Sequence, residues 1–320
     1  MVKAVFRASV ILVLIGEMCG SGRAADNVLG LPVPRDMARP GAVMLHGGGR
    51  FTDDASARFI ELAGGKQARI VLVPSAGYRQ ADYATRQQFA DAMKQRFGSW
   101  FRLAAAGRIS SIEVLSTDNP ADADNPAFVR PLLTATGVWF SGGAQSRLNY
   151  RYVGPFPRQT RFQVALREVV ARGGIVGGTS AGLAALPEIM TMYQDRQRAG
   201  GPLTVVPAHG LGLFNGAIVE QHFASRGGRL ERFTGLLRDV VRLDHLTGRP
   251  GAGMRMLGLA VEGSTGLVLQ ADRLEVLGAG NAHVFIKSPD DGIIWHTLKS
   301  GSKALLRREA RDHVMLVPGR

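Results

Sequence analysis

A serine in a glycine-rich segment is the residue of this sequence best placed for nucleophilic chemistry. Gly178-Thr-Ser180-Ala-Gly182 fits the pattern G-x-S-x-G and follows the apolar residues Ile175 and Val176. On a tight turn between a strand and a helix, such a serine projects its hydroxyl outward, and the glycines tolerate the crowded backbone. The next amide, that of Ala181, would begin the helix and help to stabilise an oxyanion. The alternative is a glycine-rich turn whose serine only caps a helix.

A serine nucleophile needs a general base, and the best-placed histidine is His222. It lies in Val219-Glu-Gln-His-Phe223, directly after a strand-like run, so it would share the sheet edge of Ser180. A packed or solvated loop histidine is the other interpretation of His222. His46 ends another predicted strand and stays open as the base, whereas the remaining histidines have no comparable surroundings.

The base in turn needs a carboxylate to orient it. Glu262 ends the strand-like Gly258-Leu-Ala-Val261 and is the candidate, with a carboxylate in a surface turn as the alternative. Glu220 is closer in sequence, but it is two residues from His222 and less able to face the edge of the ring. The order Ser-His-acid differs from the Ser-acid-His order of α/β-hydrolases, so the serine pattern alone does not assign the chain to that fold.

Alternating strand-like and helix-like segments are expected to position these residues. Short apolar runs ending in glycine-rich turns predict strands, and apolar residues at helical spacing predict the helices between them. The predicted strands are Ala42–Leu45, Arg69–Val73, Ile112–Leu115, Val138–Phe140 and Gly174–Gly177, and the predicted helices are Ala55–Ala63, Tyr83–Phe97 and Arg161–Ala171. We therefore predict an α/β fold with a mostly parallel sheet flanked by helices and reactive loops at one sheet edge.

The pattern changes after about residue 255, where short strand candidates are separated by turn residues. These strands predict C-terminal β hairpins that complete the same domain, and they are Leu257–Val261, Gly266–Gln270, Arg273–Leu277 and His283–Lys287. Two segments rich in Arg, Gly and Pro, Tyr193–Pro202 and Asp244–Arg255, are predicted to be surface loops.

Residues 1–24 are predicted to be a signal peptide, and residues 25–320 a single hydrolytic domain. Lys3 and Arg7 precede the apolar run Ala8–Ile15, and small residues at Gly22 and Ala24 suit cleavage after Ala24. The apolar run is too short for a comfortable membrane span. We expect an exported protein, periplasmic or extracellular, without a stable membrane anchor.

Composition and charge exclude several classes of protein. With 320 residues, 45% hydrophobic and 20% charged, the chain is not disordered, collagen-like or mainly coiled coil. The single cysteine, Cys19, excludes a disulfide framework and a cysteine-rich metal site. The net charge of +13 suits an anionic partner, but the arginines are scattered and no nucleic-acid-binding motif is present. No nucleic-acid partner is expected.

Four segments together resemble the cyanophycinases, relatives of peptidase E among the S51 serine peptidases. Their shared order and spacing make the resemblance specific over most of residues 40–287. It implies a fold similar to that of class I glutamine amidotransferases, which is flavodoxin-like. The segments are Ser141-Gly-Gly-Ala-Gln145, Gly177-Gly-Thr-Ser-Ala-Gly182, Glu220-Gln-His-Phe-Ala-Ser-Arg226 with Arg229 and Arg232, and Gly258-Leu-Ala-Val-Glu262.

The resemblance implies a role for each matching residue. Ser180 would be the nucleophile, His222 the base and Glu262 the third member of a triad. Ala181 and Gly143 would supply the oxyanion amides. Neither a metal nor an organic cofactor is implied. The residues implied to line the substrate pocket are Gln145, Glu220, Gln221, Arg226, Arg229 and Arg232.

The implied substrate is cyanophycin, an aspartate polymer that carries arginine on each side-chain carboxyl. An acyl-enzyme would form and β-aspartyl-arginine dipeptides would leave. Arginines can grip carboxylates through paired hydrogen bonds, and Glu220 could accept a substrate guanidinium. A solvated helix face is the alternative for Arg229 and Arg232. Family members often look dimeric, which leaves a homodimer open, although no segment identifies an interface.

The chain departs from the family pattern at positions outside the predicted triad. Ala144 stands where Asp is usual, Glu220 where Asp tends to precede Gln-His, and Leu183 where Ala tends to end the serine motif. Gly227 and Gly228 replace a single glycine between the first two arginines. These departures bear on the substrate. An aspartyl dipeptidase resembling peptidase E, and a catalytically inactive envelope protein that binds peptides, therefore stay open as alternatives.

Overall fold

The structure is a computed structural model that describes residues 27–195, 204–288, 292–309 and 314–319. The predicted signal peptide lies outside the described residues, and it stays a prediction. Within the described ranges, no helix combines the length and the apolar character needed to cross a bilayer.

A nine-stranded sheet forms the centre of the molecule, and one side of it is parallel. Each of the first five predicted strands overlaps one of these parallel strands. Four of the five parallel strands are almost entirely buried, because helices cover both faces of this part of the sheet, whereas the edge strand Ser111–Val114 has only exposed and half-buried residues. In order across the sheet, the parallel strands are β3 (Ser111–Val114), β2 (Arg69–Val73), β4 (Gly137–Phe140), β5 (Ile175–Thr179) and β1 (Ala42–His46).

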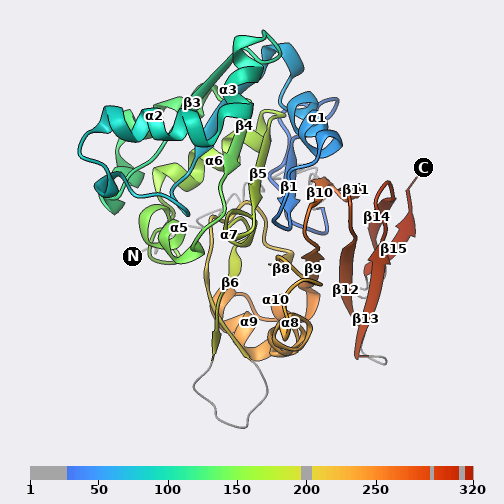
Figure 1. Ribbon diagram of the computed structural model, residues 1–320. Coiled ribbons are helices and arrows are strands. Elements are labelled where there is room, and N and C mark those ends of the chain that lie inside the picture. Colours follow the sequence, from blue (N-terminus) through green and yellow to red (C-terminus); the bar gives the residue numbers. More distant parts are fainter. Residues whose placement is uncertain (1–26, 196–203, 289–291, 310–313, 320) are drawn as a thin grey trace, which may run out of the picture.

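The other side of this sheet is antiparallel and comes from the C-terminal part of the chain (Figure 1). It begins at β1, which pairs with β5 on one side and with β10 on the other, so the complete sheet is mixed. The predicted hairpin of Gly266–Gln270 and Arg273–Leu277 is confirmed, since β10 pairs with β11. β14 and β15 form a further hairpin that was not predicted from the sequence. These strands are β10 (Thr265–Gln270), β11 (Arg273–Gly278), β14 (Lys303–Arg308) and β15 (Val314–Pro318).

A second sheet and a separate hairpin complete the strands. In the second sheet β8 and β9 are parallel, and β12 pairs antiparallel with both β9 and β13. β6 and β7 pair only with each other among the described strands. These strands are β8 (Ala217–Glu220), β9 (Leu257–Val261), β12 (Ala282–Ser288), β13 (Gly292–Leu298), β6 (Ile189–Asp195) and β7 (Thr204–His209).

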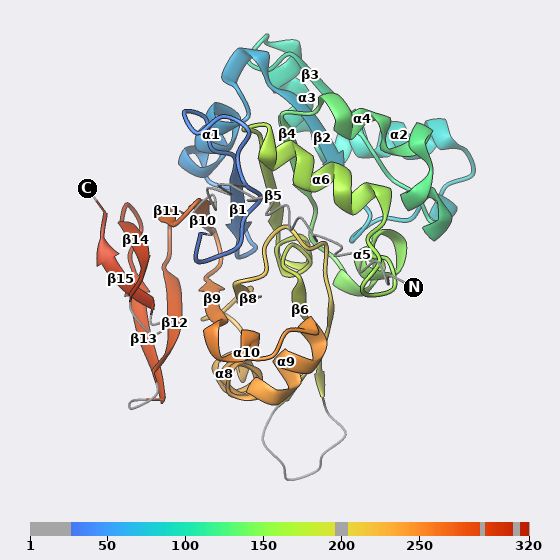
Figure 2. The ribbon, with the colours of Figure 1, turned by 180° about the vertical axis from the view of Figure 1, so that it is seen from behind.

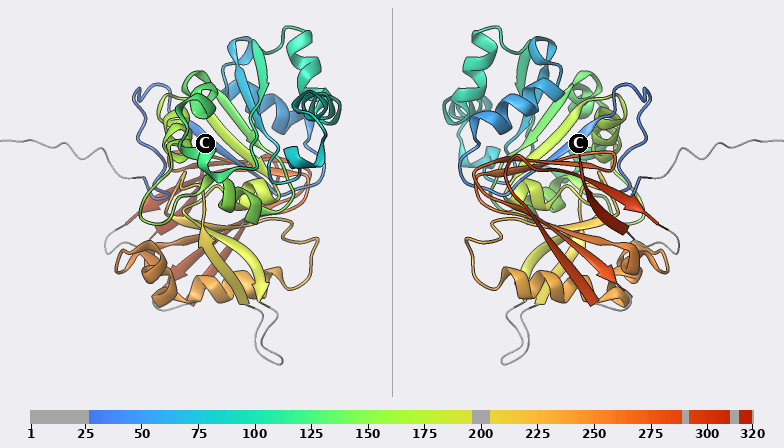
Figure 3. Two further views of the ribbon diagram at one scale, coloured as in Figure 1. Left: turned by 90° about the vertical axis from the view of Figure 1, so that its left-hand side faces the viewer. Right: turned by 90° about the vertical axis from the view of Figure 1, so that its right-hand side faces the viewer.

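Helices cover the parallel strands on both faces and pack against the second sheet. Phe59 and Trp100, from α1 and α3, pack on one face, whereas Leu132 and Phe162, from α4 and α6, pack on the other. Figure 2 shows α6 lying across the parallel strands from behind. Figure 3 shows α8, α9 and α10 (orange) at the opposite end of the molecule from α2 and α3. The helices are α1 (Asp53–Leu62), α2 (Arg86–Arg96), α3 (Gly98–Ala105), α4 (Pro126–Thr134), α5 (Gln145–Tyr152), α6 (Arg161–Ala171), α7 (Ala181–Ala184), α8 (Arg229–Arg238), α9 (Val240–Thr247) and α10 (Ala252–Arg255), with short 3₁₀ turns η1 (Gly65–Gln67), η2 (Gln80–Asp82) and η3 (Pro120–Asp124).

These elements confirm the α/β prediction with helices on both sides of parallel strands. The finer class, flavodoxin-like and similar to class I glutamine amidotransferases, stays a prediction. The prediction of a loop over Asp244–Arg255 was wrong, because α9 ends and α10 lies inside it. The Asp244 carboxylate accepts hydrogen bonds from the amides of Gly251 and Gly253, which fixes the start of α10. The other predicted loop begins inside strand β6, and its residues 196–202 lie outside the described ranges.

The parallel strands place several loops at one edge. The carboxyl ends of β1, β2, β4 and β5 lead into residues 47–49, 74–78, 141–144 and 180 respectively. Ligands of parallel α/β sheets bind at this edge, so the candidate site is sought there.

Candidate active site

Ser180 lies on a sharp bend between β5 and α7. Its backbone has φ 54° and ψ −116°, a conformation with positive φ that costs a non-glycine residue free energy. The flanking glycines have no room for a side chain. A Cβ at Gly178 would lie 2.5 Å from the carbonyl carbon of Gly182, and one at Gly182 would lie 2.5 Å from the carbonyl oxygen of Phe140. The glycine pattern is therefore what permits helix α7 to start directly behind the serine.

The carboxyl end of β1 holds the loops around Ser180 through consecutive backbone carbonyls. The carbonyl of His46 accepts a hydrogen bond from the Ser180 amide at 2.9 Å, and the next carbonyl, of Gly47, accepts one from the His222 amide at 2.9 Å. The carbonyl of Gly48 accepts a third from the Ser264 amide at 2.6 Å. One short segment thus fixes the bend that carries the serine, the backbone two residues after β8 and the turn after β9.

Ser180 and His222 are in hydrogen-bond contact. The Ser180 Oγ lies 2.8 Å from the His222 Nε2. His222 has φ 51°, and its ring lies against Gly48, where a Cβ would come within 2.0 Å of the ring Cε1. The structure therefore brings the predicted nucleophile and the predicted base together, and the missing side chain at Gly48 makes room for the ring.

The electrostatic surroundings keep His222 neutral. Burial and the positive charges of Arg226 and Arg229 lower its pKa to about 4, from an ordinary value near 6.5. A neutral imidazole can accept the hydroxyl proton of Ser180, so at neutral pH His222 is in the protonation state that a general base needs.

His46, the alternative base, is fully buried, and its hydrogen bonds are with groups other than the Ser180 hydroxyl. Its Nδ1 lies 2.8 Å from the Thr179 hydroxyl and accepts a hydrogen bond from the Gly48 amide at 3.3 Å. Burial lowers its pKa to about 4. Its contacts are therefore with the residues that hold Ser180 and the His222 ring, not with the Ser180 hydroxyl.

Two backbone amides beside Ser180 are free to bind an oxyanion. Within the described part of the chain, neither the Gly143 amide nor the Ala181 amide donates a hydrogen bond. Ala181 follows the serine directly, and the loop of Gly143 reaches Ser180, since a Cβ at Gly142 would lie 3.3 Å from the Ser180 Cβ. Gly143 is exposed. Both amides are thus unpaired, as an oxyanion donor must be, and their role stays a prediction.

Glu262 contacts a different histidine from the one expected. Its carboxylate accepts hydrogen bonds from the amide of Asn281 at 3.0 Å and from its side chain at 3.2 Å, and lies 3.1 Å from the Nε2 of His283. Trp295 donates its indole N–H to the His283 Nδ1, which leaves the ring proton on Nε2, facing Glu262. Burial raises the pKa of Glu262, but these hydrogen bonds outweigh it and the net shift is downward. No hydrogen bond joins Glu262 to His222 in the described structure, so its role in a triad stays a prediction.

The predicted pocket residues divide into a buried cluster and outlying positions. Glu220 is fully buried and forms ion pairs with Arg229 and Arg232, from α8, and Gln221 accepts a second hydrogen bond from Arg229. Because these groups bind one another, Glu220 has no free oxygen pointing into solvent for a substrate guanidinium. The alternative of a solvated helix face is excluded as well, since Arg229 and Arg232 are buried.

Two predicted pocket residues lie outside that cluster. The Gln145 side chain donates to the carbonyls of Thr191 and Met192 at 3.0 and 2.9 Å, and so joins α5 to β6. Arg226 is exposed and contributes to the lowered pKa of His222. Arg226 is thus the predicted arginine that is available to a ligand.

Among the described residues, no group of at least three His, Cys, Asp or Glu side chains lies close enough together to hold a metal ion.

Comparisons with known proteins identify several proteins to which this chain is similar. A model of peptidase family S51 matches residues 43–245. Curated cyanophycinases of Synechococcus elongatus and Thermosynechococcus vestitus are each 29% identical over 278 residues, covering 81% of this chain and 76% of theirs. The cyanophycinase of Geminocystis herdmanii is 28% identical over 229 residues, or 71% of this chain and 72% of its own. The crystal structure of a peptidase from an acI-B1 actinobacterium shares the fold, with a TM-score of 0.54 at 19% identity over 83% of this chain and 97% of that one.

The lowered pKa of His222 predicts that Ser180 stays reactive in mildly acidic solution. The rate at which a fluorophosphonate labels Ser180 should fall on acidification with a midpoint near pH 4, because His222 must be neutral to accept the proton. Arg226→Gln removes a positive charge, favours the protonated ring and should move the midpoint to higher pH. Arg226→Lys keeps the charge and is the matched control. A wild-type midpoint near 6.5, or no shift in Arg226→Gln, would contradict this assignment.

Proposed function

The chain belongs to peptidase family S51, and from this premise we propose that it is a serine peptidase acting on aspartate- and arginine-containing peptides of the cyanophycin type. It is a peptidase by family. The observation that supports a serine mechanism is the 2.8 Å contact between the Ser180 Oγ and the His222 Nε2, beside two free amides. The names of the cyanophycinase relatives support the substrate class.

The proposed reaction proceeds through an acyl-enzyme. The Ser180 Oγ bonds to the peptide carbonyl carbon as its proton passes to the His222 Nε2, and the Gly143 and Ala181 amides bind the resulting oxyanion. When the tetrahedral intermediate collapses, the C–N bond breaks and the leaving amine takes the proton from His222. A water molecule then attacks the acyl carbon while His222 accepts a proton from it. The bond between the acyl carbon and the Ser180 Oγ breaks, and His222 returns the proton to that oxygen. A carboxylate would orient His222 in these steps and would not itself take up a proton.

The surroundings of the serine suit a polymer that carries both negative and positive charges. Arg226 is exposed beside His222 and makes no hydrogen bond or ion pair with the described residues, so it can bind a substrate carboxylate. Glu220, Arg229 and Arg232 instead stabilise the end of β8, where His222 begins its turn. We propose that they support the base and do not contact the polymer. The products would be β-aspartyl-arginine dipeptides.

The test of this function is incubation of the purified protein with cyanophycin, followed by mass analysis of soluble products. We expect β-aspartyl-arginine from the wild type and a loss of at least about 10³-fold in Ser180→Ala, because only the binding and oxyanion groups remain. Ser110→Ala is the matched control, since Ser110 is exposed before β3, at the opposite sheet edge.

Three outcomes separate the alternatives. Wild-type rates in Ser180→Ala would contradict the serine mechanism. Release from short Asp-X dipeptides but not from the polymer would identify an aspartyl dipeptidase. Binding of the polymer without any hydrolysis, and without labelling of Ser180 by a fluorophosphonate, would identify an inactive peptide-binding protein.

We also propose that the protein is exported and cleaved after Ala24, on the basis of the sequence pattern of residues 1–24. The N-terminal sequence of protein recovered from the periplasm or the medium should begin at Ala25. Full-length protein retained inside the cell with its first residues intact would contradict this proposal.

A further inference from the structure

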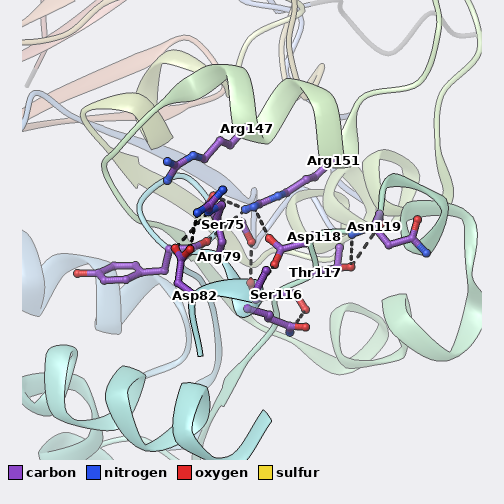
Figure 4. Close-up of polar contacts among 12 residues, drawn as sticks. Ser75, Arg79, Asp82, Ser116, Thr117, Asp118, Asn119, Arg147 and Arg151 are labelled. Atoms are coloured by element: carbon purple, nitrogen blue, oxygen red, sulfur yellow. Dashed lines mark hydrogen bonds and ion pairs between the residues drawn. The ribbon is translucent and has the colours of Figure 1, made fainter. Parts of the chain in front are cut away.

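Two arginines of helix α5 hold a turn at the end of β2 through four consecutive backbone carbonyls. Arg151 donates to the carbonyls of Ser75 at 2.5 Å and Tyr78 at 3.3 Å. Arg147, one helical turn earlier, donates to the carbonyls between them, those of Ala76 at 3.3 Å and Gly77 at 3.2 Å. Figure 4 shows both side chains extending from the helix toward the segment that carries Ser75 and Arg79. We call residues 75–78 the β2 turn.

The two arginines differ in their other contacts. Arg151 is buried and forms an ion pair with Asp118, so its replacement would leave a partly buried carboxylate without its partner. Arg147 is half-buried and has no ion-pair partner among the described residues. Its only hydrogen bonds there are the two to the β2 turn. A substitution of Arg147 therefore removes these two bonds and a weaker electrostatic contribution to Asp82, and it breaks no ion pair among the described residues.

The β2 turn lies directly against the loop that supplies the proposed oxyanion amide. The Ala76 carbonyl, which Arg147 holds, also accepts a hydrogen bond from the Ala144 amide at 2.9 Å. A Cβ at Gly143 would lie 2.2 Å from that same carbonyl oxygen, and one at Gly77 would lie 2.8 Å from the Gly142 carbonyl oxygen. Gly143 itself has φ +147°, which a residue with a side chain rarely adopts. The position of the turn thus sets the orientation of the Gly143 peptide.

We propose that Arg147 is a positioning residue for the oxyanion hole, which it serves by fixing the β2 turn against Gly143. A guanidinium suits this task, since its planar array of donors can reach two adjacent carbonyls, and its charge strengthens both hydrogen bonds. Arg147 contacts neither Ser180 nor His222, so it acts through Ala76 and Ala144 on the direction of the Gly143 N–H. The inference rests on the proposed function, because it assumes that this amide binds an oxyanion.

The test compares Arg147→Met and Arg147→Lys with the wild type in steady-state hydrolysis. We expect kcat to fall about 10- to 100-fold in Arg147→Met, since an error of about 1 Å in an oxyanion donor costs rates of that order. KM should stay within about twofold, and the acid limb of the pH profile should not move, because His222 is untouched. Arg147→Lys and added guanidinium ion should each restore part of kcat, since each returns a cationic donor.

Arg172→Met is the matched control. Arg172 also donates from one nitrogen to two backbone carbonyls, those of Leu132 and Ala135, but at the opposite sheet edge, so its loss should leave kcat unchanged. Gly77→Ala is an independent variant that keeps Arg147 and pushes the Gly142 carbonyl from the other side. It should lower kcat in the same way, which keeps the proposal testable if Arg147→Met does not fold.

The outcomes separate this inference from the function on which it rests. A higher KM with an unchanged kcat in Arg147→Met would show that Arg147 binds substrate and would overturn the inference. Equal losses in Arg147→Met and Arg172→Met would also overturn it, since they would indicate a general effect on packing. In both cases wild-type hydrolysis and labelling of Ser180 would leave the proposed function intact. If the wild-type protein showed neither hydrolysis nor labelling of Ser180, the proposed function would be overturned, and this inference with it.

Discussion

The site depends on the backbone carbonyls at the end of β1. The carbonyls of His46, Gly47 and Gly48 accept hydrogen bonds from three loops that are far apart in sequence, one of which carries Ser180 and another His222. Both of these residues have positive φ angles, which cost free energy unless surrounding bonds enforce them. Because neighbouring carbonyls of one strand end hold both backbones, the Ser180 Oγ and the His222 Nε2 are kept in contact before any substrate arrives.

Arginines serve this site mainly as structural donors. Arg229 and Arg232 neutralise the buried carboxylate of Glu220 at the end of β8, and Arg229 with Arg226 also helps to keep His222 uncharged. Arg147 holds the β2 turn against the oxyanion loop. The residues around Ser180 are therefore supported from two sides, the β1 carbonyls on the side of the base and the β2 turn on the side of the oxyanion amide. Arg226 remains exposed for a ligand.

The sequence predicts the parallel strands and the Ser180–His222 pair because both follow from local patterns. Buried parallel strands appear in the sequence as runs of apolar residues. The residues that follow such strands lie together at one edge of the sheet. Partners fixed by packing between distant elements were not predictable. Glu220 meets Arg229 and Arg232 only once α8 packs against β8, and Glu262 meets His283 because β12 pairs with β9 in one particular register. The roles of Arg147 and Arg151 depend likewise on where α5 lies, and no local motif marks them.

The central claim is that the end of β1 sets the His222 ring against Ser180, and Gly48→Ala tests it most directly. The added Cβ would lie 2.0 Å from the ring Cε1, whereas at Gly65, another glycine with positive φ, a Cβ meets nothing within 4 Å. The measurement is the rate of Ser180 labelling by a fluorophosphonate. We predict a fall of about 100-fold in Gly48→Ala and a change of less than about twofold in Gly65→Ala. Wild-type reactivity in Gly48→Ala would contradict the account.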